Sequence, residues 1–119
     1  MSLSWPEQAI KRLELLRRWR EFSNVVARAA KEVLRDRLVG VYVVGSVVEG
    51  KATVFSDIDV VIITSDLKLK SLDTIVNIKL RAEDLGLPVE APTDIKILTE
   101  EEFKEALGKL YRKAVKVEI

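Results

Sequence analysis

The sequence predicts an α/β (α+β) fold, in which helices pack against one sheet within a single domain. Stretches with apolar residues at helical spacing alternate with short β-branched runs, an order typical of helices laid against a sheet. The 119 residues, 48% of them hydrophobic, suffice for one core and fit the usual size of one domain. We therefore expect one domain over residues 1–119, comprising an N-terminal helical segment (1–37), a core (38–98) and a C-terminal helix and tail (99–119).

The N-terminal segment is expected to be helical. Apolar residues from Pro6 to about Asp36 form one stripe opposite a face of Arg, Lys and Glu. The pattern fits one long amphipathic helix, or two helices with a break near Phe22–Asn24. The arginines of the polar face are interspersed with Glu14 and Glu21, which is typical of a solvated helix surface. Nucleic acid is therefore not expected as a direct, specific ligand.

Two buried strands are expected next, at Leu38–Val44 and Ile58–Ile63, because both runs are rich in β-branched residues. Further along, Val89–Glu90 and Asp94–Leu98 resemble strand material interrupted by a proline. The alternation within Ala114–Ile119 predicts a short final strand. These segments would together form the sheet.

Two more helices are expected to alternate with these strands. Helical spacing of apolar residues covers Leu67–Leu85, and a following glycine and proline act as stop signals. Thr99 is an expected N-cap, with acids in the first turn and Glu102 placed to complete a capping box. We expect this last helix to extend to Leu107 or beyond.

The composition excludes several kinds of catalysis. The chain has no histidine and no cysteine, which rules out a thiol nucleophile, a Ser-His-Asp triad, a Cys/His zinc site and a disulfide. The net charge of +1 divides into +4 over residues 1–44, −3 over 45–66 and zero over 67–119. Catalysis would depend on carboxylates, hydroxyls, Lys, Arg or backbone groups, with a hard cation as the natural cofactor.

The sequence does not predict a membrane protein. No apolar run approaches the roughly 18 residues of a membrane span, and the N-terminus is followed by charged residues rather than by a signal-peptide core. We expect a cytoplasmic protein without a membrane partner.

The strongest chemical signal is Gly45-Ser46, followed after ten residues by Asp57-Ile58-Asp59. Residues two apart on a strand point to the same face, so the carboxylates of Asp57 and Asp59 should project together. Because adjacent carboxylates repel each other, the pair favours a divalent cation with oxygen ligands, Mg²⁺ or Mn²⁺. If the two strands are neighbours, Gly45-Ser46 would add backbone N–H groups and a hydroxyl suited to phosphate.

A third acid, Asp94, begins another predicted strand. Ile95 and Ile97 would face the core, leaving Asp94 and Lys96 on the opposite face. Asp94 could complete a two-metal cluster and act as general base toward an acceptor hydroxyl. Lys96 could contact phosphate or supply a counter-charge, or it could be a solubilising surface lysine. A phosphate-binding turn beside metal-binding carboxylates is what metal-assisted phosphoryl or nucleotidyl transfer requires.

These features resemble the polymerase-β-type nucleotidyltransferase superfamily, in particular its minimal, stand-alone members of archaea and bacteria. The resemblance covers about residues 38–98 and rests on an apolar strand, Gly45-Ser46, the Asp57-x-Asp59 spacing and the later Asp94. It implies a mixed sheet packed against helices, with residues 38–98 as the catalytic core.

The resemblance also implies an activity, in which AMP from ATP, or the monophosphate of another nucleoside triphosphate, moves to an acceptor hydroxyl. Two Mg²⁺ ions, or Mn²⁺, would be held by the three acids named above, and the triphosphate would contact Gly45 and Ser46. Val47-Val48-Glu49 occupy the segment where the family commonly has an arginine. Lys51 or Lys96 is therefore expected to compensate for that missing charge.

Minimal members of the family often pair with a small helical protein, as in HEPN/MNT-type toxin–antitoxin pairs, so the resemblance implies an acceptor on such a partner. Two alternatives remain open. One is a non-catalytic, antitoxin-like subunit that keeps the fold and neutralises a helical partner. The other is an acidic-cluster nuclease, which has no evident need for the Gly-Ser turn.

Overall fold

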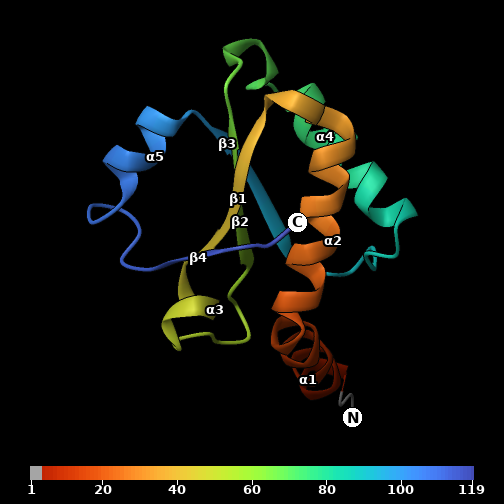
Figure 1. Ribbon diagram of the computed structural model, residues 1–119. Helices are drawn as coiled ribbons and strands as arrows, with labels where there is room; N and C mark the ends of the chain where they lie inside the picture. The colour runs from red at the N-terminus through yellow and green to blue at the C-terminus, as the bar shows by residue number, and fades with distance from the viewer. Residues whose placement is uncertain (1–3) are drawn as a thin grey trace.

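The computed structural model describes residues 4–119, with side chains from residue 7 onward, and its helices and strands follow the expected order (Figure 1). The elements are α1 (Ser4–Arg17), α2 (Trp19–Leu34), η1 (Arg35–Arg37), β1 (Leu38–Val44), α3 (Ser46–Glu49), β2 (Ile58–Thr64), η2 (Leu67–Leu69), α4 (Leu72–Asp84), β3 (Thr93–Leu98), α5 (Glu100–Ala106) and β4 (Ala114–Lys116). No helix within residues 4–119 is long and apolar enough to cross a membrane.

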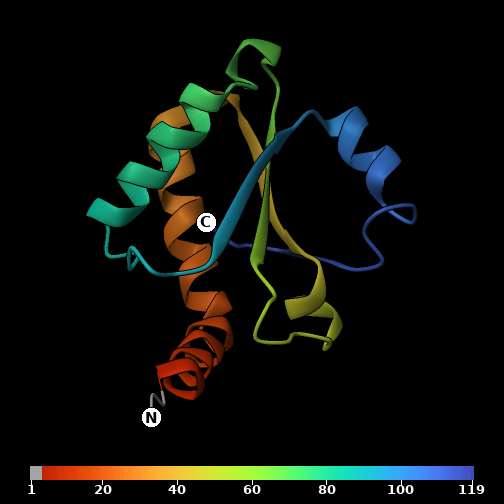
Figure 2. The same ribbon diagram turned by 180° about the vertical axis from the view of Figure 1, so that it is seen from behind.

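The sheet is mixed and contains four strands in the order β3-β2-β1-β4. β1 pairs antiparallel with β2 and with β4, whereas β2 and β3 are parallel and are joined through α4. Figures 1 and 2 show α2 and α4 on one face of the sheet and α5 on the other. This topology confirms the predicted α/β arrangement, and it places the end of β1 beside the beginnings of β2 and β3.

Buried apolar side chains lie on both faces of the sheet. The larger cluster lies between the sheet and helices α2 and α4, and includes Phe22 and Ile78. The smaller cluster lies beneath α5 and includes Val61 and Phe103. Val60 belongs to the larger cluster although Val61 belongs to the smaller one, as the alternation of side chains along a strand requires. β2 is therefore buried on both faces.

The N-terminal helical segment is divided at Arg18, so the two-helix alternative is confirmed, but the predicted break near Phe22–Asn24 is wrong. Arg18 has φ −90° and ψ 22°, and its backbone N–H donates to Leu15 O. Phe22 and Ser23 are instead buried inside α2. The Ser23 hydroxyl donates to Arg20 O within the same helix, so this polar residue does not interrupt it.

The helix predicted over Leu67–Leu85 begins later, at Leu72. Ser71 forms its N-cap, since the Ser71 side chain accepts a hydrogen bond from the backbone N–H of Thr74. Leu67–Leu69 forms the separate short helix η2. The apolar residues keep helical spacing across Ser71, so spacing alone predicted one helix where the Ser71 cap separates two.

The C-terminal elements agree with prediction except at their boundaries. Val89–Glu90 form a turn rather than a strand, since β3 begins only at Thr93. Thr99 caps α5 and forms the predicted capping box with Glu102, but the helix ends at Ala106, before the predicted Leu107. The final strand, β4, covers three residues of the predicted six.

Candidate functional site

The acids Asp59 and Asp94 lie side by side at one end of the sheet. Asp59 is the register partner of Asp94 in the parallel pairing of β2 and β3, and of Val44 in the antiparallel pairing of β1 and β2. Val44 is the last residue of β1, so Gly45-Ser46 follow at the same end. Strand pairing thus brings the Gly-Ser turn and two of the three predicted acids together.

Asp59, Asp94 and Lys96 share the face of the sheet that α5 partly covers, because Asp59 lies two residues from Val61 of the smaller cluster. Ile95, which points to the opposite face, is buried in the larger cluster, as the alternation predicted. An open groove of about 510 Å³ runs along the α5 face, between β3 and the residues after α5. Lys96 lines this groove, whereas Asp94 lines a separate pocket of about 300 Å³ between α4 and β3.

Gly45 lies so close to the Asp59 carboxylate that a side chain at this position would force the carboxylate to move. A β-carbon added at Gly45 would overlap Oδ2 of Asp59, and the Gly45 backbone has φ 84° and ψ −161°, a region essentially confined to glycine. Ser46 then begins α3, and its carbonyl accepts hydrogen bonds from the N–H groups of Gly50 and Lys51. The turn therefore lies directly against the acid, as the motif spacing suggested.

The carboxylates at this end of the sheet affect one another. The pKa of Asp59 is raised from its ordinary value, first by burial and then by the negative charge of Asp94, with Asp57 adding a smaller contribution in the same direction. Lys96 opposes this rise, which places its ammonium group within electrostatic reach of Asp59. The surroundings of Asp59 disfavour its charged form, and a bound cation would offset this effect.

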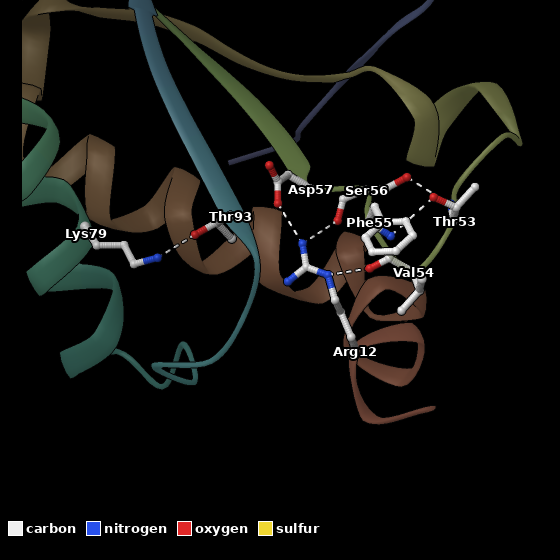
Figure 3. Close-up of polar contacts among 8 residues, drawn as sticks. All are labelled: Arg12, Thr53, Val54, Phe55, Ser56, Asp57, Lys79 and Thr93. Atoms are coloured by element: carbon white, nitrogen blue, oxygen red, sulfur yellow. Dashed lines mark hydrogen bonds and ion pairs between the residues drawn. The ribbon is translucent and has the colours of Figure 1, made fainter. Parts of the chain in front are cut away.

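Asp57 lies one residue before β2, and not within the strand as the expected alternation with Asp59 required. Its Oδ1 instead accepts a hydrogen bond from Nη2 of Arg12 at 2.9 Å (Figure 3). The same guanidinium donates to the backbone carbonyls of Val54 and Ser56. An arginine of α1 therefore holds this acid and the loop that precedes it.

The donor set fits a divalent cation in part. Asp59 and Asp94 supply the oxygen ligands that Mg²⁺ and Mn²⁺ prefer, and their mutual repulsion favours a cation between them. Within residues 4–119, however, no group of three or more Asp, Glu, His or Cys side chains has the arrangement that could hold a metal ion. Asp57, the third predicted ligand, is paired with Arg12, and its place in the ligand set stays a prediction.

The two predicted phosphate-binding lysines differ in position. Lys96 projects from β3 on the same face as Asp94 and is exposed. Lys51 is exposed in the loop after α3, and none of the ion pairs found among residues 7–119 involves its side chain. Lys96 thus shares a face with the acids, whereas Lys51 adjoins the Gly-Ser turn, since its backbone N–H donates to Ser46 O.

Sequence reasoning missed two cationic side chains at this end of the sheet. Arg12 lies four residues before the buried Leu16, and residues four apart lie on the same face of a helix. A basic residue on the inward face of α1 was therefore the signal that could have identified it. Lys79 of α4 donates to Oγ1 of Thr93 at 2.7 Å, next to Asp94 (Figure 3). No local spacing in the sequence connects Lys79 with β3, since only the packing of α4 on the sheet brings them together.

Comparisons with known proteins agree with this arrangement. The family described as "Nucleotidyltransferase domain" matches residues 26–118, which include every predicted site residue. A solved structure from Sulfolobus solfataricus, provisionally named a nucleotidyltransferase, is similar with a TM-score of 0.60 and 18% identity, over 88% of this chain and 84% of that one. A second structure with the same provisional name has a TM-score of 0.53 and 25% identity, over 76% of this chain and 91% of that one. No curated protein matched the chain.

Proposed function

Because the chain belongs to the nucleotidyltransferase domain family, we propose that it is a metal-dependent transferase that moves AMP from ATP to an acceptor hydroxyl. One observation carries this proposal beyond the family. Gly45 lies against Asp59, and Asp59 is paired with Asp94, so a turn suited to phosphate adjoins two acids suited to a cation. Residues 38–98 would form the catalytic core of a single domain.

Asp57, Asp59 and Asp94 would hold two Mg²⁺ ions, for which Mn²⁺ could substitute. The ions would supply Lewis-acid stabilisation of the charge that develops on the phosphate oxygens. Support comes from the raised pKa of Asp59, caused first by burial and then by the negative charge of Asp94, since a nearby cation would offset both effects. Gly45 and Ser46 would contact the triphosphate through backbone and hydroxyl groups.

Two lysines would complement these contacts. Lys96, which shares a face with Asp94, would contact one phosphate, and Lys51, in the loop after α3, would contact another. Both are exposed, so a phosphate could reach either ammonium group without a rearrangement of the core.

In the proposed reaction, the acceptor oxygen forms a bond to the α-phosphorus of ATP. The bond between that phosphorus and the bridging oxygen breaks, and pyrophosphate leaves with the electron pair. Asp94 would accept the proton of the acceptor hydroxyl, because it lies beside Asp59 on the open face of the sheet. The acceptor would be a hydroxyl of a small helical protein of the HEPN type, as the family resemblance implies.

One observation favours the non-catalytic alternative. The Arg12 guanidinium is bonded to Asp57, and a three-carboxylate group is not assembled within residues 4–119. A subunit that only neutralises a helical partner would need the fold but would not need the third carboxylate. The two functions make different predictions for variants of the acids.

The test replaces two acids with their neutral isosteres, as Asp59→Asn with Asp94→Asn. We expect calorimetric binding of ATP with Mn²⁺ to be lost, together with transfer of label from ATP labelled at the α-phosphate to a helical partner encoded beside this chain. The fold should persist, because burial already disfavours the charged form of Asp59 and removing that charge relieves repulsion.

The matched control is Asp36→Asn, which removes an exposed carboxylate in η1 at the opposite end of β1. Its binding and thermal unfolding should equal those of the wild type. Unchanged binding of ATP with Mn²⁺ in the double variant would contradict the enzyme proposal. Loss of labelling with intact partner binding would support catalysis as a function separate from complex formation.

A further inference from the structure

Arg12 forms a compact set of contacts at the start of β2. Nε donates to the carbonyl of Val54, while Nη2 donates to the carbonyl of Ser56 at 2.8 Å and to Oδ1 of Asp57 at 2.9 Å (Figure 3). Two of these acceptors are backbone groups of the loop before β2, and only the third is an acidic side chain. The guanidinium is therefore fixed to the loop by neutral bonds and joined to the site by one ionic bond.

The ionic bond between Arg12 and Asp57 is accessible to ligands. The Arg12 side chain is 36% exposed and the Asp57 side chain 51% exposed. Ion pairs with this exposure contribute little net stability, since water solvates both partners well when they separate. A ligand that offers each group a better partner can therefore break the pair without disturbing the two backbone contacts.

The pair also divides the acids into two kinds. Asp59 and Asp94 are neighbours on parallel strands, and no basic side chain is bonded to either among the described contacts, whereas Asp57 already has a cation. A divalent ion that needs Asp57 must displace the guanidinium. A nucleoside triphosphate that arrives with that ion brings the phosphate oxygens that a guanidinium binds in a bidentate manner.

We propose that Arg12 is a phosphate-binding residue that exchanges partners when a nucleoside triphosphate binds with its divalent cation. In the free protein its guanidinium holds Asp57, and in the complex it contacts a phosphate while Asp57 turns to the cation. The exchange leaves neither group without a counter-charge, because one ionic bond within the protein is replaced by two between protein and ligand. This inference rests on the proposed function and adds a nucleotide contact from α1.

The test variant is Arg12→Gln, for which the proposal predicts two effects of opposite sign. Without nucleotide, Mn²⁺ should bind about threefold more tightly, because Asp57 is released from its competing cation. With saturating Mn²⁺, ATP should bind about tenfold more weakly, because a charge-assisted contact to phosphate is lost. Electron paramagnetic resonance of free Mn²⁺ measures the first affinity and titration calorimetry with ATP measures the second.

Two further variants separate this role from a structural one. Arg17→Gln removes the same charge from the same helix and should leave both affinities unchanged. Arg12→Lys keeps the charge and should recover part of the ATP affinity, and it also serves if Arg12→Gln fails to fold. If Arg12 only ties α1 to the loop, Arg12→Gln would lower the affinities for both Mn²⁺ and ATP, or would change neither.

The outcomes distinguish this inference from the proposed function. A wild-type protein that does not bind ATP with Mn²⁺ would overturn both. Wild-type binding that depends on Asp59 but is unchanged in Arg12→Gln would overturn only the role of Arg12. A fall in both the Mn²⁺ and the ATP affinity of Arg12→Gln would likewise overturn the exchange.

Discussion

At the scale of single residues, Gly45 joins backbone geometry to the candidate chemistry. Its φ of 84° with ψ −161° is a conformation essentially confined to glycine, and a β-carbon there would overlap Oδ2 of Asp59. We predict that Gly45→Ala lowers the free energy of unfolding by about 3 kcal/mol, the upper end of the cost of a strained backbone residue. It should also weaken Mn²⁺ binding, because the Asp59 carboxylate must move. Urea unfolding and Mn²⁺ titration check the two effects.

The control for this prediction is Gly50→Ala. Gly50 also has a positive φ, 73°, but a β-carbon there would meet nothing within 4 Å. Only the left-handed backbone is penalised, so the free energy of unfolding should fall by about 1 kcal/mol with Mn²⁺ binding unchanged. Equal losses of Mn²⁺ affinity in the two variants would contradict a specific contact between Gly45 and Asp59.

At the scale of an element, the start of α5 is stabilised by polar groups that lie in separate parts of the chain. Lys70 Nζ donates to Glu102 at 2.7 Å, and Glu102 also accepts from the backbone N–H of Thr99 in the capping box. The hydrogen bond from Lys70 is the main cause, and that from the Thr99 backbone the second, of a Glu102 pKa below its ordinary value of 4.5. The charge of Glu102 is therefore favoured in the folded state.

This lowered pKa gives a pH dependence with a defined sign. An acid whose pKa is lower in the folded state stabilises the fold above its ordinary pKa, and this contribution is lost as the pH falls through the folded value. We predict that Glu102→Gln, which keeps the capping geometry, is less stable than the wild type at pH 7. The difference should shrink as the pH is lowered below 4.5 through the folded pKa of Glu102. Urea unfolding at pH 7 and at one pH well below 4.5 measures it.

Glu101→Gln is the comparison for this second variant, since it removes a charge from the same first turn of α5 without touching the capping box. At pH 7, Glu101→Gln should lower the free energy of unfolding less than Glu102→Gln does. A stability difference for Glu102→Gln that is the same at both pH values would contradict the ionic contribution of Lys70.

At the scale of the whole molecule, the sequence predicted features that depend on local signals or on simple strand geometry. The runs that form β1 and β2, the capping box at Thr99 and the burial of Ile95 in the core were all confirmed. Side-by-side placement of Asp59 and Asp94 followed from the same reasoning, once their strands were taken as neighbours. The family model confirmed the nucleotidyltransferase resemblance.

What the sequence could not predict depends on packing between distant segments. Asp57 falls one residue outside β2, and a boundary of one residue lies below what sequence patterns resolve. Arg12 reaches it across more than forty residues of chain, and no local spacing encodes such a contact. The break at Arg18 likewise lacks a glycine or proline to mark it.

The two cores of the molecule differ in size, and this difference predicts how the domain unfolds. The larger cluster holds α2 and α4 against the sheet, whereas α5 is held mainly through Phe103 and the few residues of the smaller cluster. Phe103 also packs against the ring of Tyr42, with the ring centroids 4.6 Å apart. Elements fixed by fewer buried contacts open at lower free energy, so α5 should unfold locally before β1 and β2.

Phe103→Ala and Phe22→Ala should each lower the free energy of unfolding by about 3 kcal/mol or more. We predict that the two variants lose amide-hydrogen protection in different parts of the molecule. Phe22 is 1% exposed within the larger cluster, so its loss should lower the protection of amide hydrogens equally in α2, β1 and β2. Loss of Phe103 should remove protection chiefly from α5, because the larger cluster remains intact. Native-state hydrogen exchange followed by mass spectrometry resolves the two patterns. If the amides of wild-type α5 exchanged only together with those of β1 and β2, the two clusters would form one cooperative unit, and the division proposed here would be wrong.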